Sequence, residues 1–398
     1  MNLPQEIVDE VIDNLVFDFG TLKSISLVRK SWTHRSRRRL FYFIQIESLG
    51  RLEQWSTIIS ADPQGIASYP RVVTLVSNSK SWLEPANLAR FYDHFRSLSR
   101  VERLTISGLE AAKFDPTSTV RYFGNFAATV RSLELRTAVG TLASLLSFIC
   151  AFPLVDDLAI KYPNPAAGGG THGEVTVPTS VPSFKGELRL LDMFHESDQL
   201  VELLCALPLS FHTISVSSRE IQRLPQLSKL VSKCGKTLRS LHITRRTPGM
   251  VSRSIHTHLV TEAIRVVSTG PTGASLALCT ALEVLRITVA HPKLLVTILG
   301  EVLPTLSKTA NLSRIVLDAD GSSQGELDID VPIWSNLDVI MSGYAEGIST
   351  KHPNRRMMLQ FRTDEEGATG EHDGWARELV SLLVLFPKVG DVVYVSKH

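Results

Sequence analysis

Cysteines, histidines and acidic residues are the side chains most able to carry out chemistry, and here they do not fall into a known catalytic spacing. The four cysteines lie far apart, without a CxxC pair or a matching pair of histidines, at Cys150, Cys205, Cys234 and Cys279. This spacing argues against a zinc site and against a disulfide framework. Each cysteine ends an apolar helical stretch, where free cysteine is commonly buried as a small apolar residue.

Three further clusters have the right residue types but the wrong pattern. The glycines at 168–170 lack the P-loop sequence and a strand-to-helix context, so they predict a flexible loop. His256 and His258 are two apart, which is wrong for one helix face. Asp328 and Asp330 lack the spaced partners of an EF-hand loop. Because Gly-x-Ser-x-Gly is also absent, we predict no catalytic residue, no metal and no cofactor, and hence no enzyme in its own right.

Composition narrows the class of protein. The chain of 398 residues has a net charge of +2, 43% hydrophobic residues and 21% charged residues, as in ordinary globular proteins. No apolar run reaches the ~20 residues that cross a bilayer, and the first residues do not resemble a secretion signal. We therefore expect a cytoplasmic or nuclear protein, or both, with neither a membrane nor nucleic acid as its partner.

A basic run without an acid covers positions 29–39 and contains Arg29, Lys30, Arg35, Arg37, Arg38 and Arg39. Such a run is found in nuclear targeting signals and in nucleic-acid contacts. It is also typical of a solvated helix face that balances an acidic neighbour. No basic surface interleaved with aromatic residues follows elsewhere. We therefore favour the solvated face.

The elements that would position this run are three short helices. The first begins after Pro4, with acids in its first turns and apolar residues at helical spacing. The second is expected to be capped by Thr21, and the third to run from about Arg29 to Phe43. A unit this small has too little core to be stable alone. It should lean on the rest of the chain, as a cap of a larger domain, or on a partner.

The order of residues in this segment favours the partner. Leu3-Pro4-x-Glu6-Ile7 is followed by Ile12 and Leu15, then Leu22, then Val28 and Trp32 four residues apart. This pattern resembles an F-box, and the stretch from Ser26 to Trp32 is most similar to the F-boxes of mushroom-forming fungi. The resemblance covers about a tenth of the chain.

F-boxes bind the Skp-type adaptor of cullin–RING (SCF) ubiquitin ligases. The resemblance therefore implies a substrate-receptor subunit, whose partners are the adaptor with its cullin ligase core and a protein substrate that the sequence does not name. It also assigns the adaptor contacts to seven residues: Leu3, Pro4, Ile7, Leu15, Leu22, Val28 and Trp32.

The rest of the chain repeats a short alternating phrase of the form apolar-x-x-Leu-x-Ile/Leu, which predicts strands. Successive copies start roughly 25 to 30 residues apart, a period that suits leucine-rich repeats. The clear copies are at 72–76, 101–106, 130–135, 155–160, 188–190, 212–216, 238–243, 282–287 and 312–317. Weaker copies are at 337–341, 357–361 and 389–395.

Apolar helical stretches fill the gaps between the copies. We expect helices at 86–98, 120–128, 142–152, 199–207, 258–267 and 294–306, and surface loops near 163–182, 244–257 and 318–332. A doubly wound α/β domain also alternates strands and helices. Its strands, however, are buried on both faces and read as continuous apolar runs, whereas these strands alternate apolar with polar residues.

We therefore predict an α/β chain of two parts. The first part, 1–45, would be a small F-box-like domain of three helices. The second, 46–398, would be a solenoid of βα units resembling divergent leucine-rich repeats, because such units bury their apolar faces only when stacked. Two alternatives remain: a repeat-containing interaction scaffold whose N-terminal helices are only a cap, and an α/β enzyme whose site has no recognisable sequence pattern.

Overall fold

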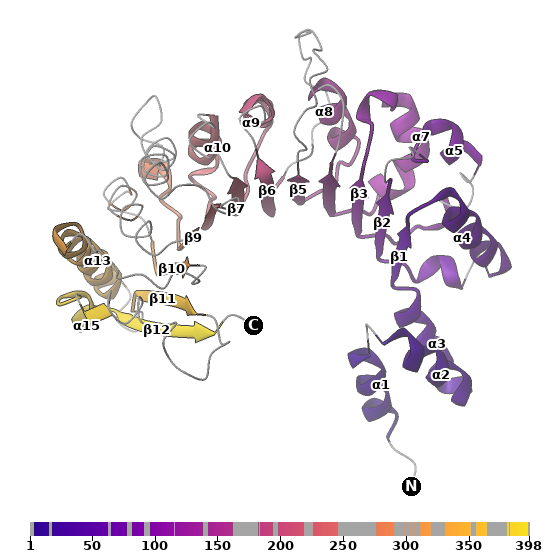
Figure 1. Cartoon of the computed structure of the whole chain (residues 1–398), viewed down its shortest axis with the longest axis horizontal. Coiled ribbons are helices and arrows are strands. Elements are labelled where there is room, and N and C mark those ends of the chain that lie inside the picture. Colours follow the sequence, from indigo (N-terminus) through magenta and orange to yellow (C-terminus); the bar gives the residue numbers. More distant parts are fainter. Residues whose placement is uncertain are drawn as a thin grey trace, which may run out of the picture. The chain divides into compact units, whose positions relative to one another are not determined.

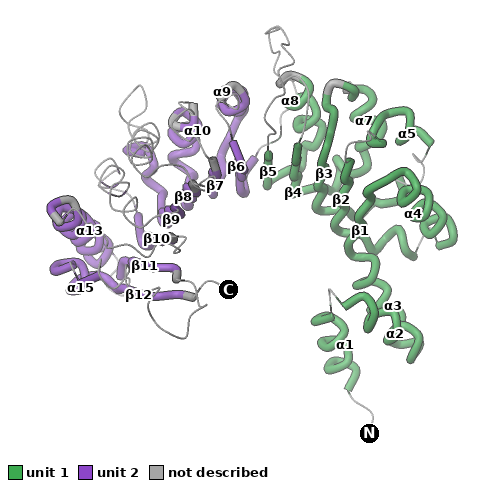
Figure 2. The backbone as a smooth tube through the Cα atoms, in the orientation of Figure 1, with its two compact units in different colours: residues 1–183 green, residues 184–398 purple. Residues whose placement is uncertain are grey.

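The computed structural model is an α/β fold of parallel strands and helices (Figure 1). It divides into two compact units, Met1–Ser183 and Phe184–His398 (Figure 2). The structure describes residues 4–15, 18–62, 65–77, 82–90, 96–114, 116–137, 142–161, 182, 184–193, 198–218, 226–245, 276–289, 299, 303, 306, 311–319, 331–351, 356–363, 380–381 and 383–396.

Three helices open the first unit: α1 (Gln5–Asn14), α2 (Phe19–Val28) and α3 (Lys30–Leu40). The side chain of Asp18 accepts a hydrogen bond from the backbone N–H of Thr21 and so caps α2. Thr21, which the sequence suggested as the cap, lies inside the helix. The third helix is shorter than predicted, because a strand begins at Phe43.

Five parallel strands follow in chain order within the first unit. They are β1 (Phe43–Ile46), β2 (Val72–Val76), β3 (Arg103–Ser107), β4 (Ser132–Arg136) and β5 (Asp157–Lys161). Their register aligns two rows of fully buried apolar side chains across β2 to β5. One row is Val73, Leu104, Leu133 and Leu158, and the other is Leu75, Ile106, Leu135 and Ile160.

The described helices that follow β1 in the first unit lie on one side of these strands (Figure 1). They are α4 (Leu49–Ala61), the 3-10 turn η1 (Ile66–Ser68), α5 (Pro85–Arg90), the 3-10 turn η2 (Ala111–Lys113), α7 (Pro116–Ala127) and α8 (Leu142–Cys150). Four buried phenylalanines pack between them, with ring centroids 5.3 to 6.5 Å apart where they meet: Phe114, Phe123, Phe148 and Phe152. The opposite face of the strands, here called the open face, carries the alternate and more polar residues.

The second unit repeats the arrangement with seven parallel strands in chain order. They are β6 (Glu187–Met193), β7 (Thr213–Ser218), β8 (Ser240–Arg245), β9 (Val284–Val289), β10 (Arg314–Ala319), β11 (Met358–Thr363) and β12 (Asp391–Ser396). Its described helices are α9 (Asp198–Ala206), α10 (Gln226–Cys234), the 3-10 turn η5 (Leu276–Leu278), α13 (Val331–Lys351) and α15 (Phe386–Val389).

All nine clear strand predictions are confirmed, with ends that shift by a few residues. The weak copies near 357 and 389 correspond to β11 and β12. The copy at 337–341 is wrong, because those residues belong to the helix α13. The buried apolar side chains of this helix recur at helical spacing: Trp334, Leu337, Met341, Ala345 and Ile348.

Each strand pairs only with strands that are its neighbours in the chain, in both units. A doubly wound sheet reverses its strand order at a switch point, so this alternative is wrong within each unit. The predicted loops fall largely outside the described residues. So do the predicted helix at 258–267, most of the one at 294–306, and the residues Leu3, His256, His258, Asp328 and Asp330.

Among the described residues, no helix has both the length and the apolar character needed to span a bilayer. Within the same residues, no three His, Cys, Asp or Glu side chains gather as metal ligands would. Burial raises the pKa of Cys150, Cys205 and Cys234 to about 11 and that of Cys279 to about 12. With these raised pKa values the four thiols stay protonated at neutral pH.

Candidate docking site on the N-terminal helices

The three N-terminal helices share a small apolar core. Val8, Ile12 and Leu22 are buried at its centre, and Leu15, Ile25, Trp32 and Leu40 pack against it. Three of the seven residues assigned by the sequence pattern, Leu15, Leu22 and Trp32, therefore contribute to the interior. A substitution at any of these three residues is therefore expected to affect the folding of the three helices as well as any binding by them.

The other assigned residues that the structure describes face outward. Pro4 is exposed, and so are Ile7 on α1, at 47%, and Val28 at the end of α2, at 67%. Three further exposed apolar side chains were not assigned from the sequence: Val11, Phe19 and Leu27, the last at 87%. Ile7 and Val11 are one helical turn apart and share a face.

These five exposed side chains are here called the apolar face: Ile7 and Val11 on α1, and Phe19, Leu27 and Val28 on α2. Apolar residues exposed singly are normal on any protein, whereas a contiguous patch of them is typical of an interaction surface. The sequence pattern identified Ile7 and Val28. The helical spacing of Ile7 and Val11 was the signal that would have added Val11.

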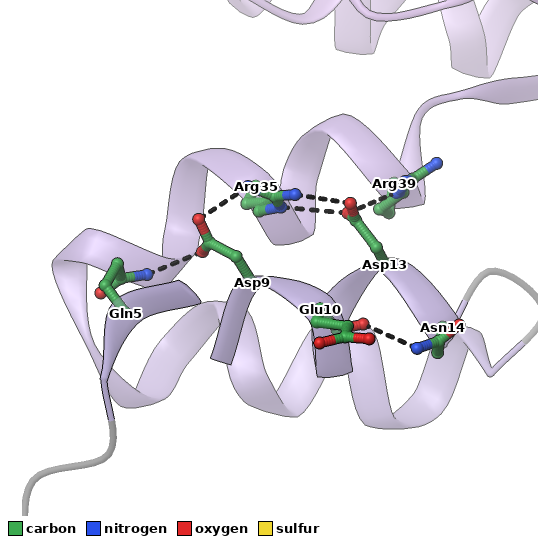
Figure 3. Close-up of polar contacts among 7 residues, drawn as sticks. All are labelled: Gln5, Asp9, Glu10, Asp13, Asn14, Arg35 and Arg39. Carbon is green, nitrogen blue, oxygen red and sulfur yellow. Dashed lines mark hydrogen bonds and ion pairs between the residues drawn. The ribbon is translucent and has the colours of Figure 1, made fainter. Parts of the chain in front are cut away.

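An ionic clamp holds α1 against α3 (Figure 3). Arg35 donates from Nη1 to Oδ2 of Asp9 at 2.6 Å and from Nη2 to Oδ2 of Asp13 at 2.5 Å. Arg39 donates from Nε to Oδ1 of Asp13 at 2.8 Å. The hydrogen bond from Arg35 and then that from Arg39 hold the pKa of Asp13 well below its ordinary value.

A polar cleft of about 460 Å³ surrounds the clamp, lined by Gln5, Asp9, Asp13, Ser31, His34, Arg35, Arg38, Arg39 and Tyr42. Two members of the basic run, Arg35 and Arg39, thus form ion pairs with the acids of α1. This agrees with the interpretation of the run as a face that balances the acidic first helix. The matching i, i+4 spacings of Asp9 with Asp13 and of Arg35 with Arg39 were the sequence signal for the clamp.

Replacing Asp13 by asparagine is expected to loosen α1. The pKa of Asp13 in the folded chain lies below its ordinary value of 3.8. Its contribution to stability is therefore present above about pH 4 and is lost as the pH falls from there toward the folded pKa. Because the clamp is partly exposed to solvent, we expect a loss of ~1 kcal/mol at neutral pH.

Amide hydrogen exchange of α1, measured by mass spectrometry, would report this change. Exchange in Asp13→Asn should be several-fold faster at neutral pH and should approach the wild-type rate in acid. Glu10→Gln removes the same charge from an exposed position of the same helix and should leave exchange unchanged. Equal exchange in Asp13→Asn and wild type at neutral pH would mean that the clamp does not hold the helix.

Few contacts join the three helices to the rest of the first unit. Nδ1 of His34 lies 2.9 Å from the hydroxyl of Tyr69, and the ring of Phe41 meets that of Trp55 edge-on. The backbone N–H groups of Arg71 and Val72 both donate to the carbonyl of Tyr42. The helices are thus anchored mainly through the end of α3 and the turn that follows it.

Comparison with known proteins gave no match: no family model fits the chain, and no curated protein is similar to it in sequence.

Proposed function

We propose that the chain is the substrate-receptor subunit of an SCF-type ubiquitin ligase. The three N-terminal helices would bind a Skp-type adaptor, and the strand and helix array would bind the target protein. The observation that carries the proposal is the apolar face, since Ile7 and Val28 are positions of the F-box-like pattern and are exposed. Covering exposed apolar side chains with a partner removes their surface from water, which contributes favourable free energy to binding.

The ligase role assigns no chemistry to this chain and needs no cofactor. A receptor that holds its target beside the ubiquitin-charged enzyme raises the effective concentration of the attacking lysine. The reaction itself would take place in partner subunits. A ligase of this kind acts in the cytoplasm or the nucleus, and we assign the chain to these compartments on that basis.

A second candidate function is a protein-interaction scaffold whose N-terminal helices only cap the array. The contacts of His34 with Tyr69 and of Phe41 with Trp55 favour this alternative, because they join the third helix and the residue after it to α4 and to the end of η1. A cap alone, however, does not need apolar side chains on its outer surface, since the terminal repeats of such arrays turn a polar face outward.

Co-purification of the full chain with a recombinant Skp-type adaptor tests the proposal. Wild-type protein should bind, and Ile7→Asp/Val28→Asp should lose at least ~100-fold in affinity, because two apolar contacts are replaced by desolvated charges. Both side chains are exposed, so the variant should keep its fold. Val120→Asp places the same charge at an exposed apolar position of α7 and should bind like wild type.

The two candidate functions give opposite results. A folded wild-type chain that does not bind the adaptor would leave the scaffold as the better account. Binding that survives in Ile7→Asp/Val28→Asp would show that the docking surface lies elsewhere. Because Trp32 packs against the core of the helices, Trp32→Ala combined with Leu3→Ala is a weaker test unless folding is measured in parallel.

A further inference from the structure

The open face of the second unit brings together polar side chains from successive strands. The register places Ser215 of β7, His242 of β8 and Arg286 of β9 side by side. One step further along the strands it places Asp318 of β10 beside Arg362 of β11. These residues alternate with the buried Leu and Ile side chains that face the helices, so all of them lie on the open face.

Two guanidinium groups and one carboxylate stand near the centre of this face. Arg286 donates from Nη2 to Oδ2 of Asp318 at 2.9 Å, which balances one guanidinium. The pKa of His242 is lowered by burial and, in addition, by the charges of Arg286 and Arg362. Both guanidinium groups therefore act on the same ring, although the two arginines stand on different strands.

The histidine ring is held in place rather than free to rotate. Oγ of Ser215 lies 3.1 Å from its Nδ1, and Oγ of Ser240 lies 2.9 Å from its Nε2. The hydroxyl of Ser215 also donates to Oε1 of Glu187 at 3.2 Å. The ring orientation is thus fixed by two hydroxyl groups. The donors on this face that make no hydrogen bond belong to neighbouring residues.

Three of these neighbours have donors that are shielded from solvent. Nε of Arg362, Oγ of Ser217 and Nε of Arg189 are buried and have no hydrogen-bond partner among the residues that the structure describes. Arg189 is still near an acid, with Nε 3.7 Å from Oε2 of Glu187. An unpaired buried donor lowers stability, and its retention is explained if a ligand supplies the acceptor.

We propose that this basic face, formed by Arg189, Ser217, His242, Arg286 and Arg362, binds an extended acidic segment of a partner protein. Its donors are spread over β6 to β11. Neighbouring strands are ~4.8 Å apart, so the donors span ~24 Å over five strand spacings, which exceeds the reach of one phosphate or one small anion. An extended chain advances ~3.3 Å per residue, and about seven residues with repeated carboxylates would cover the face.

This inference adds the chemical class of the target to the proposed function. It rests on the proposed function only where it treats the bound protein as a ligase substrate. The binding itself does not involve the N-terminal helices. A binding measurement with the peptide and without the adaptor therefore tests the basic face separately from the ligase proposal. Adaptor binding can fail while peptide binding succeeds, and peptide binding can fail while adaptor binding succeeds.

Fluorescence anisotropy of a labelled peptide that alternates glutamate and serine, titrated with the full chain, tests the proposal. The peptide should bind, and its affinity should fall with added salt. A matched peptide that alternates glutamine and serine should not bind. Arg362→Gln should weaken binding about tenfold or more, since a charge-assisted hydrogen bond is lost, and Arg362→Lys should weaken it less.

Stability distinguishes a binding role of Arg362 from a structural one. Because its Nε has no hydrogen-bond partner in the structure, Arg362→Gln should leave the melting temperature unchanged or raise it. Arg239→Gln removes the same charge from an exposed position just before β8 and should bind like wild type.

Several results would overturn the proposal. The first two are that the glutamate peptide does not bind to a folded chain, or that the glutamine peptide binds with the same affinity. The others are that Arg239→Gln loses as much peptide affinity as Arg362→Gln, or that Arg362→Gln has a lower melting temperature than wild type. Inorganic phosphate that displaces the peptide at concentrations without an ionic-strength effect would indicate a compact anion site instead of a surface for an extended segment.

Discussion

Replacing Asp338 by alanine is expected to lower the free energy of unfolding of the second unit by about 3 to 5 kcal/mol. Asp338 lies on α13 and is buried. Its Oδ2 accepts the backbone N–H groups of Val384 and Leu385, and its Oδ1 accepts that of Phe386, all at 2.8 Å. The carboxylate therefore ties the segment that begins α15 to a helix 46 to 48 residues earlier.

Alanine would leave three donors without this acceptor, one in a buried and two in part-buried hydrogen bonds, and each orphan donor costs ~1 kcal/mol or more. Asparagine keeps one carbonyl oxygen, so Asp338→Asn should lose less than Asp338→Ala. Denaturation with guanidinium, followed by circular dichroism, measures the loss, and hydrogen exchange of residues 383–396 locates it.

The neighbouring residue Ser342 provides the control. It is also buried on α13, but its hydroxyl donates back to the carbonyl of Asp338 at 2.7 Å within the same helix. Ser342→Ala leaves that carbonyl with its helical bond and should cost less than ~1 kcal/mol. Equal losses in Ser342→Ala and Asp338→Ala would show that the three backbone contacts of Asp338 contribute little.

Replacing Gly108 by alanine should destabilise the first unit by about 3 kcal/mol. Gly108 follows β3 with φ of +74°, where an L-residue costs ~1 to 2 kcal/mol. A Cβ at this position would also stand 2.0 Å from the carbonyl oxygen of Ser77. Backbone cannot yield as a flexible side chain does, so the loop after β3 or the end of β2 would have to move.

The same substitution at Gly124 should have the opposite sign. Gly124 lies inside α7, and the nearest atom to an added Cβ is Cγ1 of Val120 at 3.9 Å. Alanine has a higher helix propensity than glycine, so Gly124→Ala should stabilise by ~0.5 to 1 kcal/mol. Thermal unfolding of the two variants measures this contrast. A neutral Gly108→Ala would mean that the loop adapts without strain.

The strands of the array could be predicted because each alternates buried with polar residues over five or six positions, as Leu104 and Ile106 do in β3. β1 was missed because it is only four residues long and begins three positions after the end of α3, so that the predicted helix was extended over its first residue, Phe43. The helix α10 was missed, and part of α13 was read as a strand, because a short apolar group such as Leu337 to Met341 suits either period.

The candidate sites could be predicted from the sequence only in part. The F-box-like pattern assigned Leu15, Leu22 and Trp32 to binding, but a residue pattern cannot separate a contact with a partner from a contact with the segment's own core. The ionic clamp and the basic face depend on which elements lie side by side. Arg286 and Arg362 are 76 positions apart in the chain, and only the register of β9, β10 and β11 brings them to one surface.

The strictly sequential strand order has a consequence for cooperativity. Because each strand pairs only with its predecessor and its successor, the stability of each unit is approximately a sum of intrinsic and nearest-neighbour terms, as in a one-dimensional chain of coupled segments. A disturbance then weakens with every interface it crosses. The strands β6 to β11, which carry the proposed basic face, can therefore change in sequence while β1 to β3 and the helices before them keep their own stability.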